Sequence, residues 1–264
     1  TEHVPEMIEL IEQLIERGHA YEAEGHVLFH VNSMKDYGKL SRQNRDGILE
    51  GARVEVAPYK KDPADFVMWK PSSDDQPGWD SPWGRGRPGW HIECSAMIHK
   101  HAGFPVDIHA GGHDLVFPHH ENEIAQGECA YGEDYAKYWM HNGMLVVDGE
   151  KMSKSLGNFL LVRDVLPQVK GEVIRFYMMG THYRQPYDFH RDKLSEQKEI
   201  LDRFYLALRK VKDIPVDKSM DVPEEVQKAL LDDVNTPLVV THLHEYLHRL
   251  NKAVTDDEKR EFKT

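Results

Sequence analysis

The sequence predicts an α/β fold followed by a helical region. A strand-like segment, Val106 to His109, runs into two glycines, as at the carboxyl edge of a parallel sheet, where α/β folds place their ligands. Helical patterns begin before it at Trp90 and after it at Phe117. From Leu194 onward, apolar residues recur at helical spacing. The 264 residues are enough for about two domains.

Composition excludes several classes of protein. The formal net charge of -12 argues against indiscriminate binding of polyanions, so any contact with nucleic acid is expected to be local. The mean hydropathy is -0.63, and the sequence has no run of about 18 apolar residues that would predict a membrane span. The first residues read as an amphipathic helix and not as a secretory leader. Two cysteines are too few for a disulfide scaffold, which favours a reducing compartment, and we expect a cytoplasmic protein.

The N-terminal third mixes one helix with strands. Pro5 to Arg17 has apolar residues at helical spacing. His19 to Val31 and Ala52 to Trp69 contain alternating apolar and polar residues, which predict strands. Asp74 to Gly89 is rich in proline, glycine and aspartate and predicts a functional surface loop. Three tryptophans in or beside this loop are expected to be packing anchors, and a ligand-lining role stays open for one of them: Trp79, Trp83 and Trp90.

A candidate metal site lies in the histidine-rich part of the chain, between His91 and His141. His119 and Glu123 are four residues apart, so on a helix both project from one face. Cys94 is expected to reach the same ion through space. Zinc accepts a thiolate, an imidazole and a carboxylate, and three protein ligands with one open position are typical of a catalytic site. The alternative is a solvated helix face.

Cys129 is the competing thiol. Its neighbours do not form a ligand set, and we expect it to fill the core as a small apolar residue.

The stretch from Gly149 to Phe159 predicts a phosphate-binding loop. Lys151 and Lys154 place two ammonium groups three positions apart, and Ser153 and Ser155 add hydroxyl donors between flanking glycines. Glycine lets the backbone bend closely around a ligand. The alternative is a solvated surface turn.

The C-terminal region predicts consecutive helices. Leu194 to Val211 is amphipathic, a second helix follows from Pro223, and Asp232 to Pro237 predicts a break and a restart, because proline fits the first turn of a helix. His244 and His248 are four residues apart, but without a cysteine or carboxylate pattern we expect them on a solvated face.

Four segments together carry a resemblance to a known family. They are Gly89 to Met97 (GWHIECSAM), His109 to Glu123 (HAGGHDLVFPHHENE), Tyr138 to Met144 (YWMHNGM) and Lys151 to Ser155 (KMSKS). In this order they resemble the cysteinyl-tRNA synthetases, which are class I aminoacyl-tRNA synthetases. The resemblance implies a Rossmann-like parallel sheet, interrupted by a connective insertion that contains strands and followed by an all-helical bundle.

The resemblance also implies a division into four parts. Residues 1–84 are expected to hold the end of the first half of the nucleotide fold and the connective insertion, and residues 85–150 the second half of the catalytic domain. Residues 151–193 would form the lysine loop and the stem-contact fold. Residues 194–264 would begin the helical bundle that binds the anticodon stem.

Site residues are carried over position by position. The implied roles are as follows: catalytic, Lys151 and Lys154; cysteine binding, Trp90 and Asp114; ATP binding, His109, Gly111, Gly112 and Lys154; zinc binding, Cys94, His119 and Glu123. Zinc prefers the thiolate of cysteine to the hydroxyl of serine, so the metal can discriminate without an editing site. The lysine loop would stabilise negative charge as the cysteine carboxylate attacks the α-phosphate of ATP and pyrophosphate leaves.

The implied partners are ATP with Mg²⁺, L-cysteine and tRNA(Cys), with Zn²⁺ as the resident metal and a monomer as the expected state. For Arg175, Tyr183 and Arg184 a structural role and a contact to tRNA phosphates stay open, since arginine often binds the phosphate backbone. The reaction expected of the family is ATP-dependent activation of cysteine to cysteinyl-adenylate, followed by transfer to tRNA(Cys).

The sequence also departs from the family pattern. Class I synthetases carry a second signature, His-Ile-Gly-His or a close variant, and no His-x-Gly-His occurs in these 264 residues. A further zinc-binding cysteine of the same early segment is also missing. We therefore expect a fragment or a natural remnant, with cysteine-dependent ATP–pyrophosphate exchange near background and weakened zinc binding. The alternatives are a non-catalytic module that binds zinc and RNA, and the related ligase that joins cysteine to an amino sugar.

Overall fold

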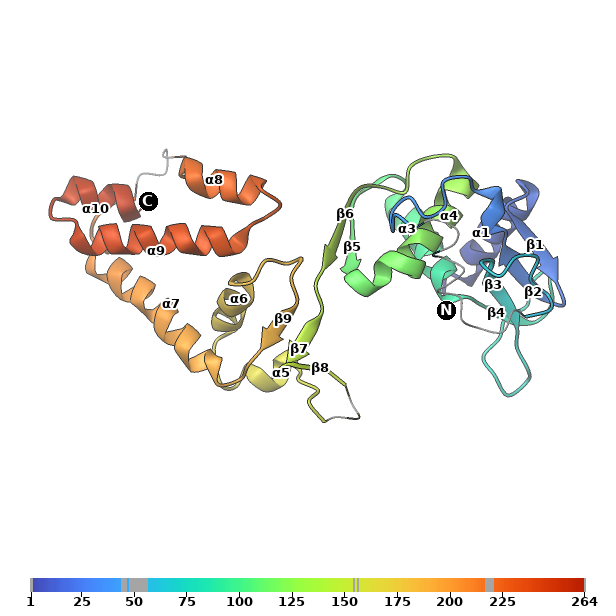
Figure 1. The fold of residues 1–264 in the computed structure, drawn as a ribbon, viewed down its shortest axis with the longest axis horizontal. Helices are drawn as coiled ribbons and strands as arrows, with labels where there is room; N and C mark the ends of the chain where they lie inside the picture. The colour runs from blue at the N-terminus through green and yellow to red at the C-terminus, as the bar shows by residue number, and fades with distance from the viewer. Residues whose placement is uncertain are drawn as a thin grey trace. The chain divides into compact units, whose positions relative to one another are not determined.

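The computed structural model describes residues 2–43, 47, 57–153, 155, 157–216 and 221–263. The chain divides into two compact units, Thr1–His141 and Asn142–Thr264, and Figure 1 shows the elements of each.

Unit 1 contains these elements in chain order: α1 (Val4–Glu16), β1 (Ala20–Ala23), β2 (His26–Phe29), η1 (Val31–Ser33), β3 (Phe66–Pro71), β4 (Gly86–Pro88), α3 (Trp90–Ala102), β5 (Val106–Gly112), η2 (His113–Leu115), η3 (Val116–His120), α4 (Glu121–Tyr131) and β6 (Ala136–Asn142, which ends one residue into unit 2). Unit 2 contains β7 (Leu145–Val147), β8 (Glu150–Lys151), α5 (Val162–Val165), α6 (Gly171–Met179), β9 (Tyr187–Phe189), α7 (Lys193–Lys210), α8 (Glu224–Leu231), α9 (Thr236–Lys252) and α10 (Asp256–Lys263).

Helix α1 forms where the sequence predicts it. Its apolar residues recur every three or four positions, and Pro5 stands at the first turn, where its missing N–H costs nothing. The helix ends before Gly18, whose φ of +78° favours glycine. The buried stripe consists of Val4, Met7, Leu10, Ile11 and Leu14.

An antiparallel sheet with the order β1-β2-β3-β4 occupies the N-terminal part of unit 1. β1 and β2 form a hairpin in which Ala23 pairs with His26, and the two turn residues, Glu24 and Gly25, both have positive φ. The strands expected in His19 to Val31 are confirmed as this hairpin, and β3 confirms the end of the second segment. Residues 52–56 of that segment lie outside the described residues.

The core of unit 1 lies between α1, the sheet and the two helices α3 and α4. Trp69 of β3 and Tyr135 before β6 are its largest fully buried side chains. Trp79 and Trp83 pack against this core, as expected of packing anchors. Trp90 does not, because its side chain is 61% exposed at the start of α3, so the expectation of an anchor is wrong for this tryptophan.

β5 and β6 form a two-stranded sheet linked through α4. The amide of Val106, the first residue of β5, donates to the carbonyl of Tyr135, immediately before β6 (3.1 Å). Both strands therefore begin at the same edge and run parallel, and a helical crossover is the connection that parallel strands require. The strand, glycine and helix pattern read from the sequence is confirmed here. The predicted helix at Trp90 is α3. The one expected from Phe117 begins as the π-helical segment η3, in which Phe117 itself is non-helical, and becomes α4 at Glu121.

Unit 2 begins with a small mixed sheet of order β8-β7-β9. β7 and β9 are parallel, and β7 and β8 form a tight antiparallel hairpin. α6 packs next to this sheet, and Val165, Ile174, Phe189 and Leu194 form its buried cluster.

Three of the four C-terminal helices, α7, α8 and α9, follow the predicted pattern, whereas α10 was not predicted. α9 begins at Thr236, and the side chain of Asn235 caps it by accepting from the amide of Leu238 (3.2 Å). The expected break between α8 and α9 is confirmed, with Asp233 and Val234 both at positive φ. His244 and His248 are exposed on α9, as expected.

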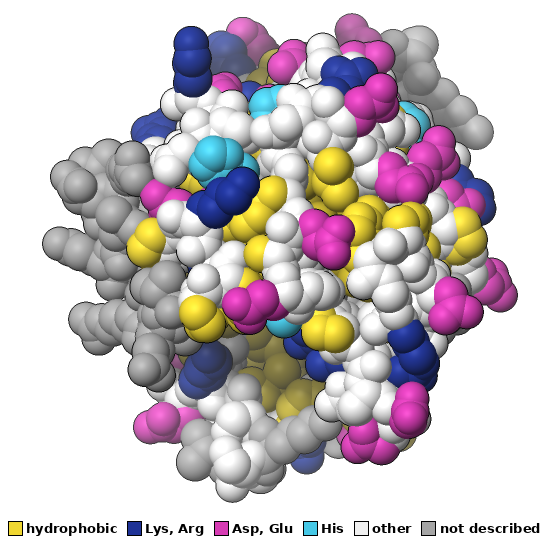
Figure 2. All heavy atoms as spheres, turned by 90° about the vertical axis from the view of Figure 1, so that its right-hand side faces the viewer, with side chains coloured by type: hydrophobic (Ala, Val, Ile, Leu, Met, Phe, Trp, Pro, Cys, Tyr) yellow, Lys and Arg dark blue, Asp and Glu magenta, His cyan; other side chains and the backbone are white. Residues whose placement is uncertain are grey.

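The surface carries mixed charge. On the face of unit 1 drawn in Figure 2, acidic and basic side chains are interspersed with apolar patches and a hollow. None of the helices in the described part of the chain is long and apolar enough to cross a membrane.

Candidate functional site

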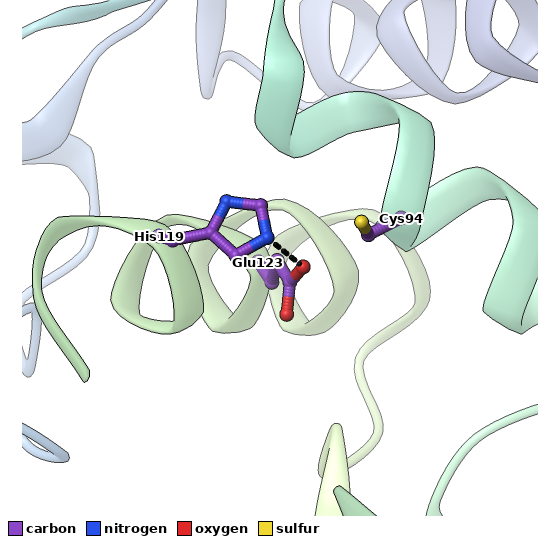
Figure 3. Close-up of side chains that lie close together, drawn as sticks. All are labelled: Cys94, His119 and Glu123. Carbon is purple, nitrogen blue, oxygen red and sulfur yellow. Dashed lines mark ion pairs between the residues drawn. The ribbon is translucent and has the colours of Figure 1, made fainter. Parts of the chain in front are cut away.

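Cys94, His119 and Glu123 converge in unit 1 (Figure 3). Cys94 lies on α3, while His119 and Glu123 come from η3 and α4. Their ligand atoms all lie within 4.8 Å of one another, and Nε2 of His119 is 2.9 Å from Oε1 of Glu123. The structure therefore brings together the three residues that the sequence assigned to one metal ion.

A second candidate set shares the same carboxylate. Oε2 of Glu123 is 2.8 Å from Nε2 of His109, and the ligand atoms of His109, His120 and Glu123 also lie within 4.8 Å of one another. His109 is on β5, so the carboxylate stands between that strand and η3. The sequence had placed His109 on the ATP side, and only the fold reveals how close it lies to Glu123.

Glu123 is a buried carboxylate that lacks conventional hydrogen bonds. Its residue is 1% exposed, and neither carboxylate oxygen has a partner with hydrogen-bond geometry. Two imidazoles face it at ion-pair distance instead. Atoms that lie close without hydrogen-bond geometry are the arrangement expected of ligands aimed at a common point, and a buried polar group without a partner is costly. This cluster therefore fits a bound cation.

The neighbouring histidines keep the carboxylate of Glu123 ionised. Burial alone would raise the pKa of Glu123, but the neighbouring rings of His109 and His119 lower the pKa to about 2. Burial, reinforced by Glu123, raises the pKa of Cys94 to about 12. Without a cation the thiol therefore keeps its proton, and a metal that binds it must displace that proton.

The imidazole of His119 is held on three sides. Its Nδ1 lies 2.7 Å from Nδ1 of His91, so one of these nitrogens donates to the other. The indole of Trp90 stacks on the ring of His119, with centroids 4.3 Å apart and an interplanar angle of 25°. With the third side facing Glu123, the ring has one orientation, as is typical of metal-ligating histidines.

The helices that carry the cluster are tied together below it. Ser95 of α3 donates to Oε1 of Gln126 on α4 (2.8 Å), and both side chains are fully buried. The start of α4 is anchored by Glu121, whose carboxylate accepts from the amides of Gly38 (3.0 Å) and Ser41 (2.8 Å). A rigid support of this kind is what positions a ligand set accurately.

The residues after β5 are placed differently from the metal cluster. Asp114 is exposed in the turn η2. A Cβ at Gly111 would come within 2.8 Å of Cε1 of His120, and one at Gly112 within 2.5 Å of Oδ1 of Asp114. Close packing against His120 therefore explains Gly111, whereas Gly112 is approached only by the exposed side chain of Asp114. The contact of both glycines with ATP stays a prediction, as does the contact of Asp114 and Trp90 with cysteine.

The predicted phosphate loop lies in unit 2. Lys151 is exposed at the end of β8, and Lys154 lies outside the described residues. The side chain of Asn158 bridges the loop by donating to the carbonyl of Lys151 (3.2 Å) and accepting from the amide of Ser153 (2.8 Å). Sequence reasoning overlooked this asparagine, whose side-chain amide can both donate to and accept from backbone groups.

Comparison with known proteins decides the family. The family described as "tRNA synthetases class I (C) catalytic domain" matches residues 1–199, and a DALR domain matches residues 225–263. The chain belongs to the class I tRNA synthetases. The resemblance read from the four motifs is thereby confirmed.

Curated relatives agree. The chain is 62% identical over 260 residues to the cysteine–tRNA ligase of Paramagnetospirillum magneticum, a match that covers 98% of this chain and 57% of that protein. It is 58% identical to the cysteine–tRNA ligase of Rhodospirillum rubrum, covering 100% of this chain and 57% of that protein. The chain thus spans little more than half the length of the curated relatives it matches.

Solved structures of other synthetases show the same fold. A methionyl-tRNA synthetase of Mycobacterium tuberculosis in complex with methionyl-adenylate superposes with a TM-score of 0.65 at 14% identity, covering 100% of this chain and 69% of that one. A putative arginyl-tRNA synthetase of Campylobacter jejuni superposes with a TM-score of 0.55 at 16% identity, covering 99% of this chain and 57% of that one. The predicted α/β, Rossmann-like class is therefore confirmed, whereas the boundaries at residues 84, 150 and 193 stay predictions.

The cluster around Glu123 is wider than the sequence indicated. His91, His109 and His120 contact the ligand set but were not assigned to it. The density of histidine between His91 and His141 was the available signal, and distances in three dimensions were needed to interpret it.

Proposed function

We propose that this chain provides the cysteine-recognition part of a cysteine–tRNA ligase. In the reaction, cysteine and ATP form cysteinyl-adenylate and pyrophosphate, and the cysteinyl group is then transferred to tRNA(Cys). The observation that carries the proposal is the convergence of Cys94, His119 and Glu123 below an exposed tryptophan. Relatives named cysteine–tRNA ligase at 54% to 62% identity support it.

The donor set fits zinc. A thiolate, an imidazole and a carboxylate are ordinary zinc ligands, and three of them leave one tetrahedral position open. Cys94, His119 and Glu123 would hold the ion, which when bound supplies preference for a thiolate over the hydroxyl of serine. The buried oxygens of Glu123, which face His109 and His119 at ion-pair distance without hydrogen-bond geometry, are the structural support for a cation at this point.

The surrounding residues have separate tasks in this proposal. His91 orients the ring of His119 through the contact between their Nδ1 atoms. Trp90, which stacks on His119 and is mostly exposed, would cover the bound cysteine and exclude water from it. Asp114, on the turn after β5, would bind the ammonium group of cysteine.

The predicted phosphate-binding loop, Gly149 to Phe159, would act on ATP. Lys151 and Lys154 would balance the negative charge that develops as pyrophosphate leaves, together with Mg²⁺ bound to ATP, while His109, Gly111 and Gly112 would border the nucleotide. Bridging of the loop by Asn158 would limit its conformations before ATP binds. We propose that the protein acts as a monomer in the cytoplasm.

Cysteine binding tests this proposal without requiring complete catalysis. In calorimetric titrations of the zinc-loaded chain, cysteine should bind at least about 100-fold more tightly than serine, because a buried ligand site strongly rejects an analogue that lacks the matching group. Chelation of zinc should abolish the difference. Equal affinity for cysteine and serine in the presence of zinc would contradict the proposed function, and so would binding of cysteine that does not depend on zinc.

A further inference from the structure

The hairpin β7–β8 leads directly into the phosphate loop, and its turn is fixed from outside. Asp148 and Gly149 are the two turn residues, with φ of +52° and +79°, as a tight two-residue hairpin requires. The amide of Asp148 donates to the carbonyl of Phe189 (3.2 Å), and the amide of Gly149 donates to Oδ1 of Asp188 (3.0 Å). The neighbouring strand β9 therefore holds the turn from which Lys151 extends.

His190 connects the same two elements through its side chain. Its Nδ1 lies 2.9 Å from Oδ1 of Asp148 on the turn, and its Nε2 lies 3.2 Å from Oδ2 of Asp188 on β9. The ring thus stands between two carboxylates, one on each side.

Other groups near His190 contact its backbone and not its ring. From α6, the hydroxyl of Tyr177 accepts the backbone amide of His190 (3.3 Å). From α7, Lys193 donates its own backbone amide to the carbonyl of His190 (3.2 Å), while its ammonium group pairs with Glu196 (2.9 Å). These contacts fix the backbone of His190 and leave its ring nitrogens to Asp148 and Asp188.

The charge state of the ring decides whether both contacts are favourable. A neutral imidazole has one N–H and one lone pair, so it donates to one carboxylate and turns a lone pair towards the other. An imidazolium has two N–H donors and a positive charge, so it can hydrogen-bond Asp148 and attract the carboxylate of Asp188, which lies at ion-pair distance without hydrogen-bond geometry. Both contacts are therefore favourable only with a charged ring.

We propose that His190 is a proton-dependent positioning residue of the phosphate loop. Protonated, it clamps the β7–β8 turn to β9 and holds Lys151, at the end of that hairpin, at a defined place for ATP. Neutral, it releases one of the two carboxylates. This role rests on the proposed function for its use in ATP binding, but the clamp itself is a property of unit 2. Histidine is the residue type whose charge changes most readily near neutral pH, so the test compares pH values on both sides of neutrality.

Hydrogen exchange of two backbone amides tests the clamp. The amide of Gly149 reports on the turn, and the amide of Ser153, bound by Asn158, reports on the phosphate loop. After correction for intrinsic exchange, protection of both amides in the wild-type chain should be about two- to fivefold higher at pH 5.5 than at pH 8, the range expected for exposed ion pairs.

Two variants and a control separate the clamp from general effects of pH. His190→Gln, which does not titrate, should show low protection at both pH values. His190→Arg keeps a positive charge with several donors and should show high protection at both. His248→Gln, an exposed histidine on α9, should behave like the wild type.

Each outcome decides the proposal. It is overturned if wild-type protection is independent of pH, if His190→Gln keeps the pH dependence of the wild type, or if Gly149 responds while Ser153 does not. None of these readings requires cysteine or ATP. Absence of zinc-dependent cysteine binding would therefore remove the proposed function and leave the clamp, whereas flat exchange profiles would remove the clamp and leave the proposed function.

Discussion

Replacing Cys94 by serine tests the metal site most directly, because the chain offers a matched control in its other cysteine. Cys94→Ser removes the thiolate from the set with His119 and Glu123 and keeps the side-chain size. Cys129→Ser makes the same change on α4, where the thiol packs against the core and belongs to neither candidate metal set among the described residues. A difference between the two variants therefore reports on metal binding.

The expected size of the effect follows from linkage. At a free zinc concentration of 100 times the dissociation constant, binding stabilises the folded chain by about 2.7 kcal/mol. Loss of one of three ligands should weaken binding at least about 100-fold, because even changes to residues around a metal site cost 10- to 100-fold. The stabilisation at the same zinc concentration then falls to about 0.4 kcal/mol. For a unit of this size 1 kcal/mol corresponds to roughly 4 °C, so the zinc-dependent rise in Tm should fall from about 10 °C to about 2 °C.

Differential scanning fluorimetry with and without zinc measures this shift. Cys129→Ser should lower the Tm slightly in both conditions and keep the zinc-dependent rise. If Cys94→Ser also keeps the full rise, the ion does not use the thiol. The overlapping set of His109, His120 and Glu123 would then be favoured, and His120→Gln would distinguish it.

Three further predictions follow from contacts elsewhere in the chain. Leu14→Ala, at a fully buried position of α1, should destabilise unit 1 by about 2 to 5 kcal/mol in urea unfolding. Asn158→Ala should accelerate hydrogen exchange of the Ser153 amide several-fold, since its bonded acceptor is lost. Arg184 pairs with Asp233 and, through their hydrogen bond, lowers the pKa of that carboxyl to about 2. The pair therefore stabilises unit 2 above the ordinary aspartate pKa of about 3.9 and stops doing so as the pH falls through about 2, and Asp233→Asn should remove this pH dependence from acid unfolding curves.

The controls for these predictions lie nearby. Glu12→Ala on the same helix as Leu14 should change the unfolding free energy little, because this side chain is exposed. Unchanged exchange at Ser153 in Asn158→Ala would mean that the side-chain bridge does not hold the loop. An acid unfolding curve of Asp233→Asn identical to the wild type would show that the ion pair with Arg184 contributes nothing measurable, as many exposed pairs do.

Much of the fold could be read from the sequence because its signals are local. The apolar stripe of α1, the glycine after it, the hairpin in β1 and β2 and the proline at the start of α9 all act within a few residues. Trp90 was misjudged as an anchor because burial depends on what surrounds a side chain, and no local pattern contains that information. The helix expected from Phe117 does form, as the π-helical segment η3 followed by α4, but Phe117 itself has non-helical backbone angles.

The sequence by itself determined the family and the identity of the metal-site candidates. Motif spacing is a property of the chain, and four motifs in order are specific. Only the tertiary structure decided how these residues meet: Cys94 is 25 positions from His119 along the chain, and His109 approaches Glu123 from a strand. The contact of His190 with Asp148 could likewise not be predicted from the sequence. The two residues are 42 positions apart and meet only through the parallel pairing of β7 and β9. Distances between segments distant in sequence are set by packing of the whole unit, and they decide which carboxylates share a proton or an ion.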